Sequence, residues 1–178
     1  MRHVLVLVSL AAALVATAQP PKAERVESKG GVVVCVSPPA ADVGLSILKR
    51  GGNAVDAAVA VGFAMAVTWP EAGNIGGGGF MIVAPPGKEV RCIEYRETAP
   101  ALAREDLFAD GRVTWLDHKA AGVPGTVRGL ALAHQKYGRL PWKDVVMPAV
   151  KLAEDGFTVN AVLANGLNRV LADPKTTN

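Results

Sequence analysis

The first part of the hydrophobic pattern predicts a strand followed by a helix. Residues 31–37 read Gly-Val-Val-Val-Cys-Val-Ser, a continuous β-branched run that is typical of a strand buried on both faces. After two prolines, residues 40–50 carry apolar positions at helical spacing, and Gly51-Gly52 gives this helix a C-terminal stop. The chain is therefore expected to enter its folded part through a strand and a first helix.

A second helix is predicted over residues 54–67, which are apolar around nearly the whole circumference. Asn53 is placed to cap this helix, and Asp56 at its third position can reach back toward the cap. A helix of this kind has to be covered by protein on several sides. A membrane helix is the alternative, but the run is shorter than about 18 residues and contains Asp56. We therefore favour a core helix that ends before Pro70.

The next segments predict a hairpin. Residues 80–83 and 90–95 are strand-like runs, and a connection rich in proline and glycine joins them. Alternation along the second run places Arg91, Ile93 and Tyr95 on one face of the strand.

The rest of the pattern predicts three further helices. Thr126 can cap a helix over residues 127–137. Pro141 can open another helix over residues 142–154, which Pro148 is expected to kink or split. Residues 160–171 form a last amphipathic helix. With no linker between these elements, they belong to one domain or to part of one.

The N-terminus has the three parts of a secretory signal peptide. Met1-Arg2-His3 gives a basic start, residues 4–15 give an apolar run, and Ala16-Thr17-Ala18 gives small residues before a cleavage point. An uncleaved membrane anchor is the alternative, which the shortness of the apolar run disfavours. We expect a signal peptide at residues 1–18, a polar leader at 19–30, and a secreted or periplasmic protein without a stable membrane span after cleavage.

Composition narrows the classes of function. The net charge is +3 and the charged residues are scattered, so no basic block indicates nucleic-acid binding.

Cys35 and Cys92 are the only cysteines. A disulfide is allowed in an exported protein, but two buried free thiols explain the pair equally well. His118 and His134 have no partner at ligand spacing, so a metal site has no support.

Four consecutive glycines, residues 76–79, lead into the first strand of the hairpin. Glycine loses the most conformational freedom on folding, so the run implies either positive φ angles or backbones or ligands that approach too closely for a Cβ. The run follows a helix, precedes a strand and is not followed by lysine, unlike a dinucleotide-binding loop or a P-loop. Nucleotide binding is therefore not expected.

Arg96, at the end of the second strand, is the residue best suited to bind a ligand. Its guanidinium can present two parallel donors to a carboxylate. A structural ion pair with Glu94, Glu97 or Asp106 is the alternative, and the residues alone favour it.

Thr126 could be a nucleophile that chain cleavage exposes, but a helix cap is the simpler explanation of this residue. The residue types and their spacing alone therefore do not indicate a particular reaction.

Four segments carry distinctive sequences: GGNAVDAAVA at residues 51–60, GNIGGGGFM at 73–81, YRETAP at 95–100 and GVPGT at 122–126. In this order and spacing they resemble the successive signatures of the gamma-glutamyltranspeptidase family. The resemblance continues to the end of the chain and covers residues 31–178.

The resemblance implies an α+β fold that is part of the αββα sandwich of an N-terminal nucleophile hydrolase. It implies a precursor that cuts itself into a large and a small subunit. The implied reaction transfers the gamma-glutamyl group of glutathione to water, amino acids or peptides, without a cofactor. By the same resemblance, Arg96 binds the α-carboxylate of the glutamyl substrate, and a threonine at the start of the small subunit is the nucleophile.

The resemblance covers only the N-terminal part of the large subunit. Thr176-Thr177 is similar to the Thr-Thr at the family's cleavage site, but it falls too early, so we interpret it as coincidence. We therefore expect a fragment that is inactive alone and whose partners are the rest of the large subunit and the small subunit. A related beta-lactam acylase and a non-catalytic exported remnant are the alternatives.

Overall fold

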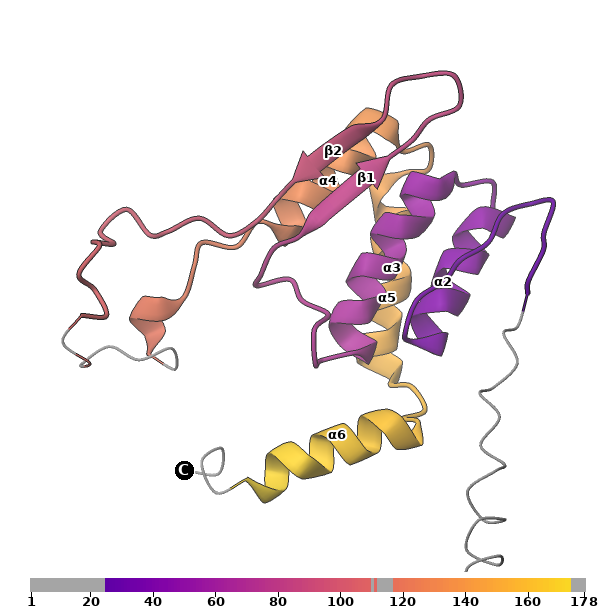
Figure 1. The fold of residues 1–178 in the computed structure, drawn as a ribbon. Coiled ribbons are helices and arrows are strands. Elements are labelled where there is room, and N and C mark those ends of the chain that lie inside the picture. Colours follow the sequence, from indigo (N-terminus) through magenta and orange to yellow (C-terminus); the bar gives the residue numbers. More distant parts are fainter. Residues whose placement is uncertain (1–24, 110, 112–116, 174–178) are drawn as a thin grey trace, which may run out of the picture.

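The computed structural model describes residues 25–109, 111 and 117–173. The expected signal peptide, the first half of the polar leader (residues 19–24) and Thr176-Thr177 lie outside this part. The elements follow the order α2 (Pro38–Lys49), α3 (Ala54–Thr68), β1 (Phe80–Val83), β2 (Arg91–Glu94), the 3-10 turn η1 (His118–Ala120), α4 (Thr126–Tyr137), α5 (Trp142–Asp155) and α6 (Ala161–Ala172), as Figure 1 shows. Of the helices in the described part, none is both long enough and apolar enough to cross a membrane.

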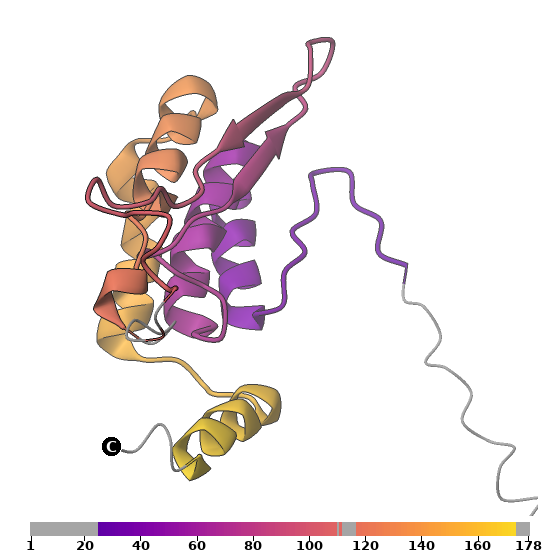
Figure 2. The same ribbon diagram turned by 60° about the vertical axis from the view of Figure 1, so that its left-hand side comes forward.

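Helix α3 is the centre of the fold. It packs against α2, α4 and α5, and α2, α3 and α5 run side by side in Figures 1 and 2. Val59, Ala60 and Ala64 on α3 are fully buried. Small aliphatic side chains let neighbouring helices approach α3 on several sides, so the prediction of a core helix is confirmed.

The predicted cap of α3 is present, and it also ties distant segments together. The Asn53 Oδ1 accepts hydrogen bonds from the backbone amides of Val55 (2.9 Å) and Asp56 (3.0 Å), and Asp56 Oδ2 accepts from Asn53 N at 2.9 Å. The fully buried Asp56 carboxylate also accepts from the backbone amides of Arg139 (3.0 Å) and Leu140 (3.4 Å). One side chain therefore caps α3 and fixes the connection between α4 and α5.

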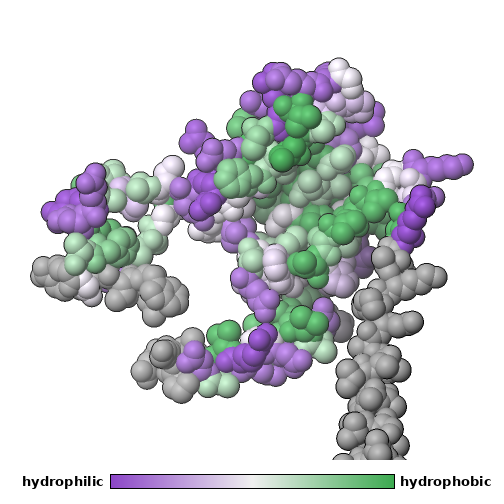
Figure 3. Space-filling model, viewed as in Figure 1, coloured by the Kyte–Doolittle hydropathy of each residue, from purple (hydrophilic) through white to green (hydrophobic). Residues whose placement is uncertain are grey.

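Strands β1 and β2 form the predicted antiparallel hairpin, with Phe80 opposite Glu94. Val83 and Ile93 are buried on the face toward the helices. On the opposite face Phe80 is 56% and Ile82 is 73% exposed. Among the described residues, helices therefore cover one face of the sheet, and the other face presents apolar side chains to solvent (Figures 1 and 3).

The predicted strand at residues 31–37 does not form. The segment runs along the helices without a strand partner, and Val32, Val34 and Val36 are 52%, 87% and 62% exposed. In the described part of the chain no strand pairs with it, and a β-branched run cannot become a sheet without a hydrogen-bonded neighbour. Figure 3 shows hydrophobic side chains on this segment as well as on the hairpin.

The prolines of two helices behave differently from the prediction. Helix α2 begins at Pro38, two residues early, because proline fits a first turn in which the N–H has no partner. Pro148 does not split α5. Because proline has no N–H, it cannot donate to the Asp144 carbonyl in the preceding turn, and Arg50 Nη1 donates to this carbonyl at 3.4 Å instead.

The two cysteines are free, so a disulfide is absent from the structure. Cys35 is partly buried, whereas Cys92 on β2 is exposed. The alternative of two buried thiols is therefore wrong for Cys92, because its side chain lies on the uncovered face of the hairpin.

The last predicted helix is confirmed as α6, where Asn160 Oδ1 accepts from Leu163 N at 2.9 Å.

Candidate functional site

The glycine run passes directly over the end of β2. A Cβ built on Gly78 would lie 2.6 Å from the Tyr95 carbonyl oxygen and 2.7 Å from the Arg96 Cα. None of the four glycines at 76–79 has a positive φ angle, and a Cβ on Gly76 would meet open space. Close approach of two backbones therefore explains Gly78, whereas Gly77 and Gly79 lie against the side chains of Asn74 and Tyr95. The alternative of left-handed torsions is wrong for all four glycines.

A second segment, residues 122–126, lies against the same strand end from another direction. A Cβ on Gly125 would clash with the Tyr95 carbonyl oxygen. Thr98 and Val123 exchange backbone hydrogen bonds of 3.2 and 2.8 Å in an antiparallel bridge. The backbone around Arg96 is thus enclosed by two segments that come from different parts of the chain.

Thr126 does not cap α4, contrary to the prediction. Gly125 is the N-cap residue, and the Thr126 hydroxyl donates to Asn74 Oδ1 at 2.7 Å. The amides of Gly125 and Thr126 donate to the Gly77 carbonyl at 2.8 and 3.0 Å. The glycine run therefore satisfies the start of α4, and the threonine hydroxyl is left to bind Asn74.

Arg96 lies on the uncovered side of the hairpin, with 60% of its side chain exposed. Its Nε donates to Glu97 Oε2 at 3.1 Å, and its guanidinium carbon lies 5.9 Å from the centre of the Phe80 ring. Of the predicted alternatives, Glu97 is therefore a partner, whereas Asp106 pairs with Arg104 at 3.0 Å. No described residue accepts a hydrogen bond from the two Nη atoms, so this edge of the guanidinium is available to a ligand.

The electrostatics of the pair keep Glu97 ionised. A hydrogen bond from its own backbone and one from the Arg96 side chain lower the pKa of the Glu97 carboxyl. The neighbouring Tyr95 is partly buried, and this burial raises the pKa of its phenol. Glu97 thus stays an acceptor that holds the Nε edge of Arg96 in place.

Two hollows meet at Arg96, each of roughly the volume of a small ligand. The first is about 350 Å³ and is lined by residues that include Glu94, Thr98, Pro124, Arg128 and Leu132. The second is about 390 Å³ and includes Ala99, Phe108, Lys119 and Gly122. Arg128 and Lys119 add positive charge to the surroundings of Arg96, which suits an anionic ligand.

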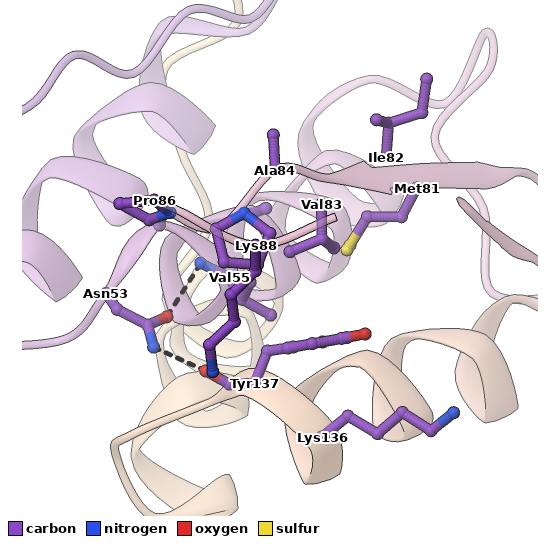
Figure 4. Close-up of a pocket in the computed structure, with 13 residues that line it drawn as sticks. Asn53, Val55, Met81, Ile82, Val83, Ala84, Pro86, Lys88, Lys136 and Tyr137 are labelled. Carbon is purple, nitrogen blue, oxygen red and sulfur yellow. Dashed lines mark hydrogen bonds between the residues drawn. The ribbon is translucent and has the colours of Figure 1, made fainter. Parts of the chain in front are cut away.

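A separate apolar groove of about 560 Å³ lies between the hairpin and the first turn of α3. Figure 4 shows that Asn53, which hydrogen-bonds to Val55 N and Tyr137 O, lines it together with Met81 and Lys88. Arg96 does not line this groove.

In residues 25–109, 111 and 117–173, no three His, Cys, Asp or Glu side chains come together as a metal site.

The comparison with protein families identifies the chain. A family model described as gamma-glutamyltranspeptidase matches residues 40–177. The chain belongs to this family. A glutathione hydrolase proenzyme of Escherichia coli strain K12 is 51% identical over 148 residues, which cover 80% of this chain and 26% of the relative. The chain thus spans about a quarter of the length of this curated relative.

Solved structures of the family have the same fold. The Helicobacter pylori gamma-glutamyltranspeptidase aligns with a TM-score of 0.76 and 39% identity over 86% of this chain and 47% of that one. A cephalosporin acylase from Bacillus halodurans aligns with a TM-score of 0.68 and 32% identity over 85% of this chain and 31% of that one. The α+β fold, as part of an N-terminal nucleophile hydrolase sandwich, is confirmed.

The sequence pattern singled out Arg96 and did not indicate the contacts that surround it. The contact between Asn74 and Thr126 joins positions 52 residues apart, and neither residue type signals such a partner. The one signal was the presence of glycines in both segments, because glycine in a strand or at its end indicates a close backbone approach. The binding role of Arg96 stays a prediction.

Proposed function

We propose that this chain is the N-terminal part of the large subunit of an exported glutathione hydrolase that also transfers gamma-glutamyl groups. The proposal is supported by 51% identity to a glutathione hydrolase proenzyme. The single structural observation that carries it is Arg96, whose side chain is 60% exposed and borders two hollows at the end of β2.

Arg96 is suited to hold the α-carboxylate of a gamma-glutamyl substrate. A guanidinium binds a carboxylate through two parallel hydrogen bonds, which fix both the position and the orientation of the ligand. Glu97 occupies the Nε atom at 3.1 Å and leaves the Nη1 and Nη2 atoms for this contact. The chain thereby supplies substrate binding to the reaction.

The nucleophile comes from elsewhere in the proposed enzyme. The Thr126 hydroxyl is buried and donates to Asn74, so it is not an attacking group. In the proposed precursor, self-cleavage frees a threonine at the start of the small subunit, whose amine acts as the base. The partners of this chain are then the remainder of the large subunit and the small subunit, and no cofactor is required.

Export is part of the proposal and rests on the N-terminal sequence. A signal peptide at residues 1–18 and a polar leader at 19–30 precede the folded part. Glutathione and related gamma-glutamyl compounds would be met in the periplasm or outside the cell.

The test measures release of p-nitroaniline from gamma-glutamyl p-nitroanilide by the mature full-length protein and by this chain alone. We expect activity in the former and none in the latter. Arg96→Ala should raise KM about ten- to a hundredfold, the range expected for losing hydrogen bonds to a charged group, with a smaller change in kcat. Arg104→Ala, which removes an exposed arginine paired with Asp106, is the matched control and should leave KM unchanged. Turnover by the chain alone, or an unchanged KM in Arg96→Ala, would contradict the proposal.

A second candidate is a cephalosporin acylase, favoured by the structural likeness at 32% identity. Both activities break an amide by acyl transfer, so the substrate separates them. Faster hydrolysis of a cephalosporin side-chain amide than of the gamma-glutamyl anilide would select the acylase.

A further inference from the structure

Arg96 lies two residues beyond the last residue of β2, so its position depends on contacts outside the strand. Tyr95 N donates to the Gly79 carbonyl at 2.9 Å, and Thr98 N donates to the Val123 carbonyl at 3.2 Å. The backbone between them is held by the two segments that enclose it, residues 74–79 and 122–126. We call these two segments the clamp.

The two halves of the clamp are joined to each other at two acceptors. The Gly77 carbonyl accepts from the amides of Gly125 (2.8 Å) and Thr126 (3.0 Å). The Asn74 Oδ1 accepts from Gly77 N at 3.0 Å and from the Thr126 hydroxyl at 2.7 Å. The link from Thr126 to Asn74 connects two side chains, and Thr126 is only 6% exposed.

The clamp sets the distance between two backbones that both touch the strand end. Gly78 approaches the Arg96 Cα from one half, and Gly125 approaches the Tyr95 carbonyl from the other. If the two halves separate, the backbone at Tyr95 and Arg96 can move, and the Arg96 guanidinium is no longer held in one position. Displacements of about 1 Å are enough to weaken a binding constellation strongly.

We propose that Thr126 is a positioning residue for Arg96: its hydroxyl, through Asn74, holds the clamp at the spacing that presents the guanidinium to a substrate carboxylate. This inference rests on the proposed function, because it requires Arg96 to bind that carboxylate. The substitution that tests it is Thr126→Val, which keeps the β-branched shape and replaces the hydroxyl by a methyl group.

In the mature full-length protein, Thr126→Val is expected to raise KM for gamma-glutamyl p-nitroanilide about three- to tenfold, the change expected for one net hydrogen bond, with a smaller change in kcat. Thr126→Ser retains the hydroxyl and should restore a KM close to that of the wild type. Asn74→Ala removes the acceptor from the other half and should raise KM as Thr126→Val does, which keeps the test open if the valine variant does not mature.

Thr68→Val is the matched control for loss of a buried threonine hydroxyl. Thr68 is 3% exposed, donates to the Ala64 carbonyl at 3.0 Å and lies 2.6 Å from the Ser37 hydroxyl oxygen, at the end of α3. None of these contacts involves the clamp. The substitution should lower the melting temperature and leave KM unchanged, as a purely structural hydroxyl would.

Amide hydrogen exchange in the same proteins gives a readout that does not depend on activity. Thr126→Val should speed exchange at the Tyr95 and Thr98 amides, and Thr68→Val should not. If Arg96→Ala raises KM but Thr126→Val does not, the inference is overturned and the proposed function stands. If Arg96→Ala leaves KM unchanged, the proposed function fails and the positioning role fails with it. Unchanged exchange at both amides would overturn the clamp itself.

Discussion

The glycine run offers a sharp internal comparison, because neighbouring glycines differ in what surrounds them. We consider Gly78→Ala with Gly76→Ala as its control. A Cβ on Gly78 would lie 2.6 Å from the Tyr95 carbonyl oxygen and 2.7 Å from the Arg96 Cα, and both are backbone atoms. A Cβ on Gly76 would have nothing within 4 Å.

The magnitude follows from these distances. Ordinary contact begins near 3.4 Å, so the alanine methyl group requires the end of β2 to move by about 0.8 Å, the difference from 2.6 Å. Overpacking of this kind costs about 1–3 kcal/mol. Each 1 kcal/mol lowers the melting temperature by about 2–4 °C in a protein of about 150–250 residues, and by less in the longer full-length protein. Gly76 has no positive φ angle, so alanine there should be neutral or slightly stabilising, by up to about 1 kcal/mol.

The assay combines thermal melts with steady-state kinetics of the mature full-length protein. Gly78→Ala is expected to lower the melting temperature and also to raise KM, because the displaced backbone carries Arg96. Gly76→Ala should leave the melting temperature unchanged or slightly raised, and should leave KM unchanged. Equal destabilisation by the two substitutions, or a Gly78→Ala variant with wild-type stability and KM, would refute the assignment of the run to close backbone packing.

Two further substitutions and one titration test other parts of the fold. Asp56→Asn should lower the free energy of unfolding by about 2–3 kcal/mol, because buried backbone donors lose a charged acceptor; thermal melts compare it with Asp42→Asn on the exposed side of α2, which should have little effect. The lowered pKa of Glu97 means that its pairing with Arg96 is complete above the ordinary glutamate range and is lost as the pH falls through the lowered value. Carbon NMR should show this titration, and a midpoint that does not rise in Arg96→Ala would contradict the pairing. Arg50→Met should destabilise by about 0.5–1.5 kcal/mol by removing the donor to the carbonyl that Pro148 leaves free and the 3.5 Å ion pair with Asp144 Oδ1, and an unchanged melting temperature would show that water replaces these contacts.

Helices and the hairpin could be predicted because their signals are local. Asn53 and Asp56 are three residues apart and form the cap that their spacing predicts. Phe80–Val83 and Arg91–Glu94 pair through a short connection, so the strand pattern and the turn residues agree. In each case the residues that decide the structure lie within a few positions of one another.

The predictions that failed concern residues whose structure depends on partners far away in the sequence. Residues 31–37 have the composition of a strand, but a strand forms only with a partner, and composition does not supply one. Thr126 has the residue type of a cap, but Asn74, 52 residues away, accepts its hydroxyl instead. Arg96 could be singled out because it lies just beyond a strand and because its surrounding motif resembles a family signature, and its binding role stays a prediction. The clamp could not be found, because its contacts depend on how distant segments meet.

The long separation between the halves of the clamp has a consequence for the order of folding. Helices α2 and α3 are adjacent in the chain and pack together, as do β1 and β2, so these contacts close short loops. The contact between Asn74 and Thr126 closes a loop of 52 residues, which costs more entropy and slows its formation. In a nascent or refolding chain we therefore expect the hairpin contacts to form before the contact between Asn74 and Thr126. If Arg96 binds an anionic ligand as proposed, this order makes binding depend on α4 being in place.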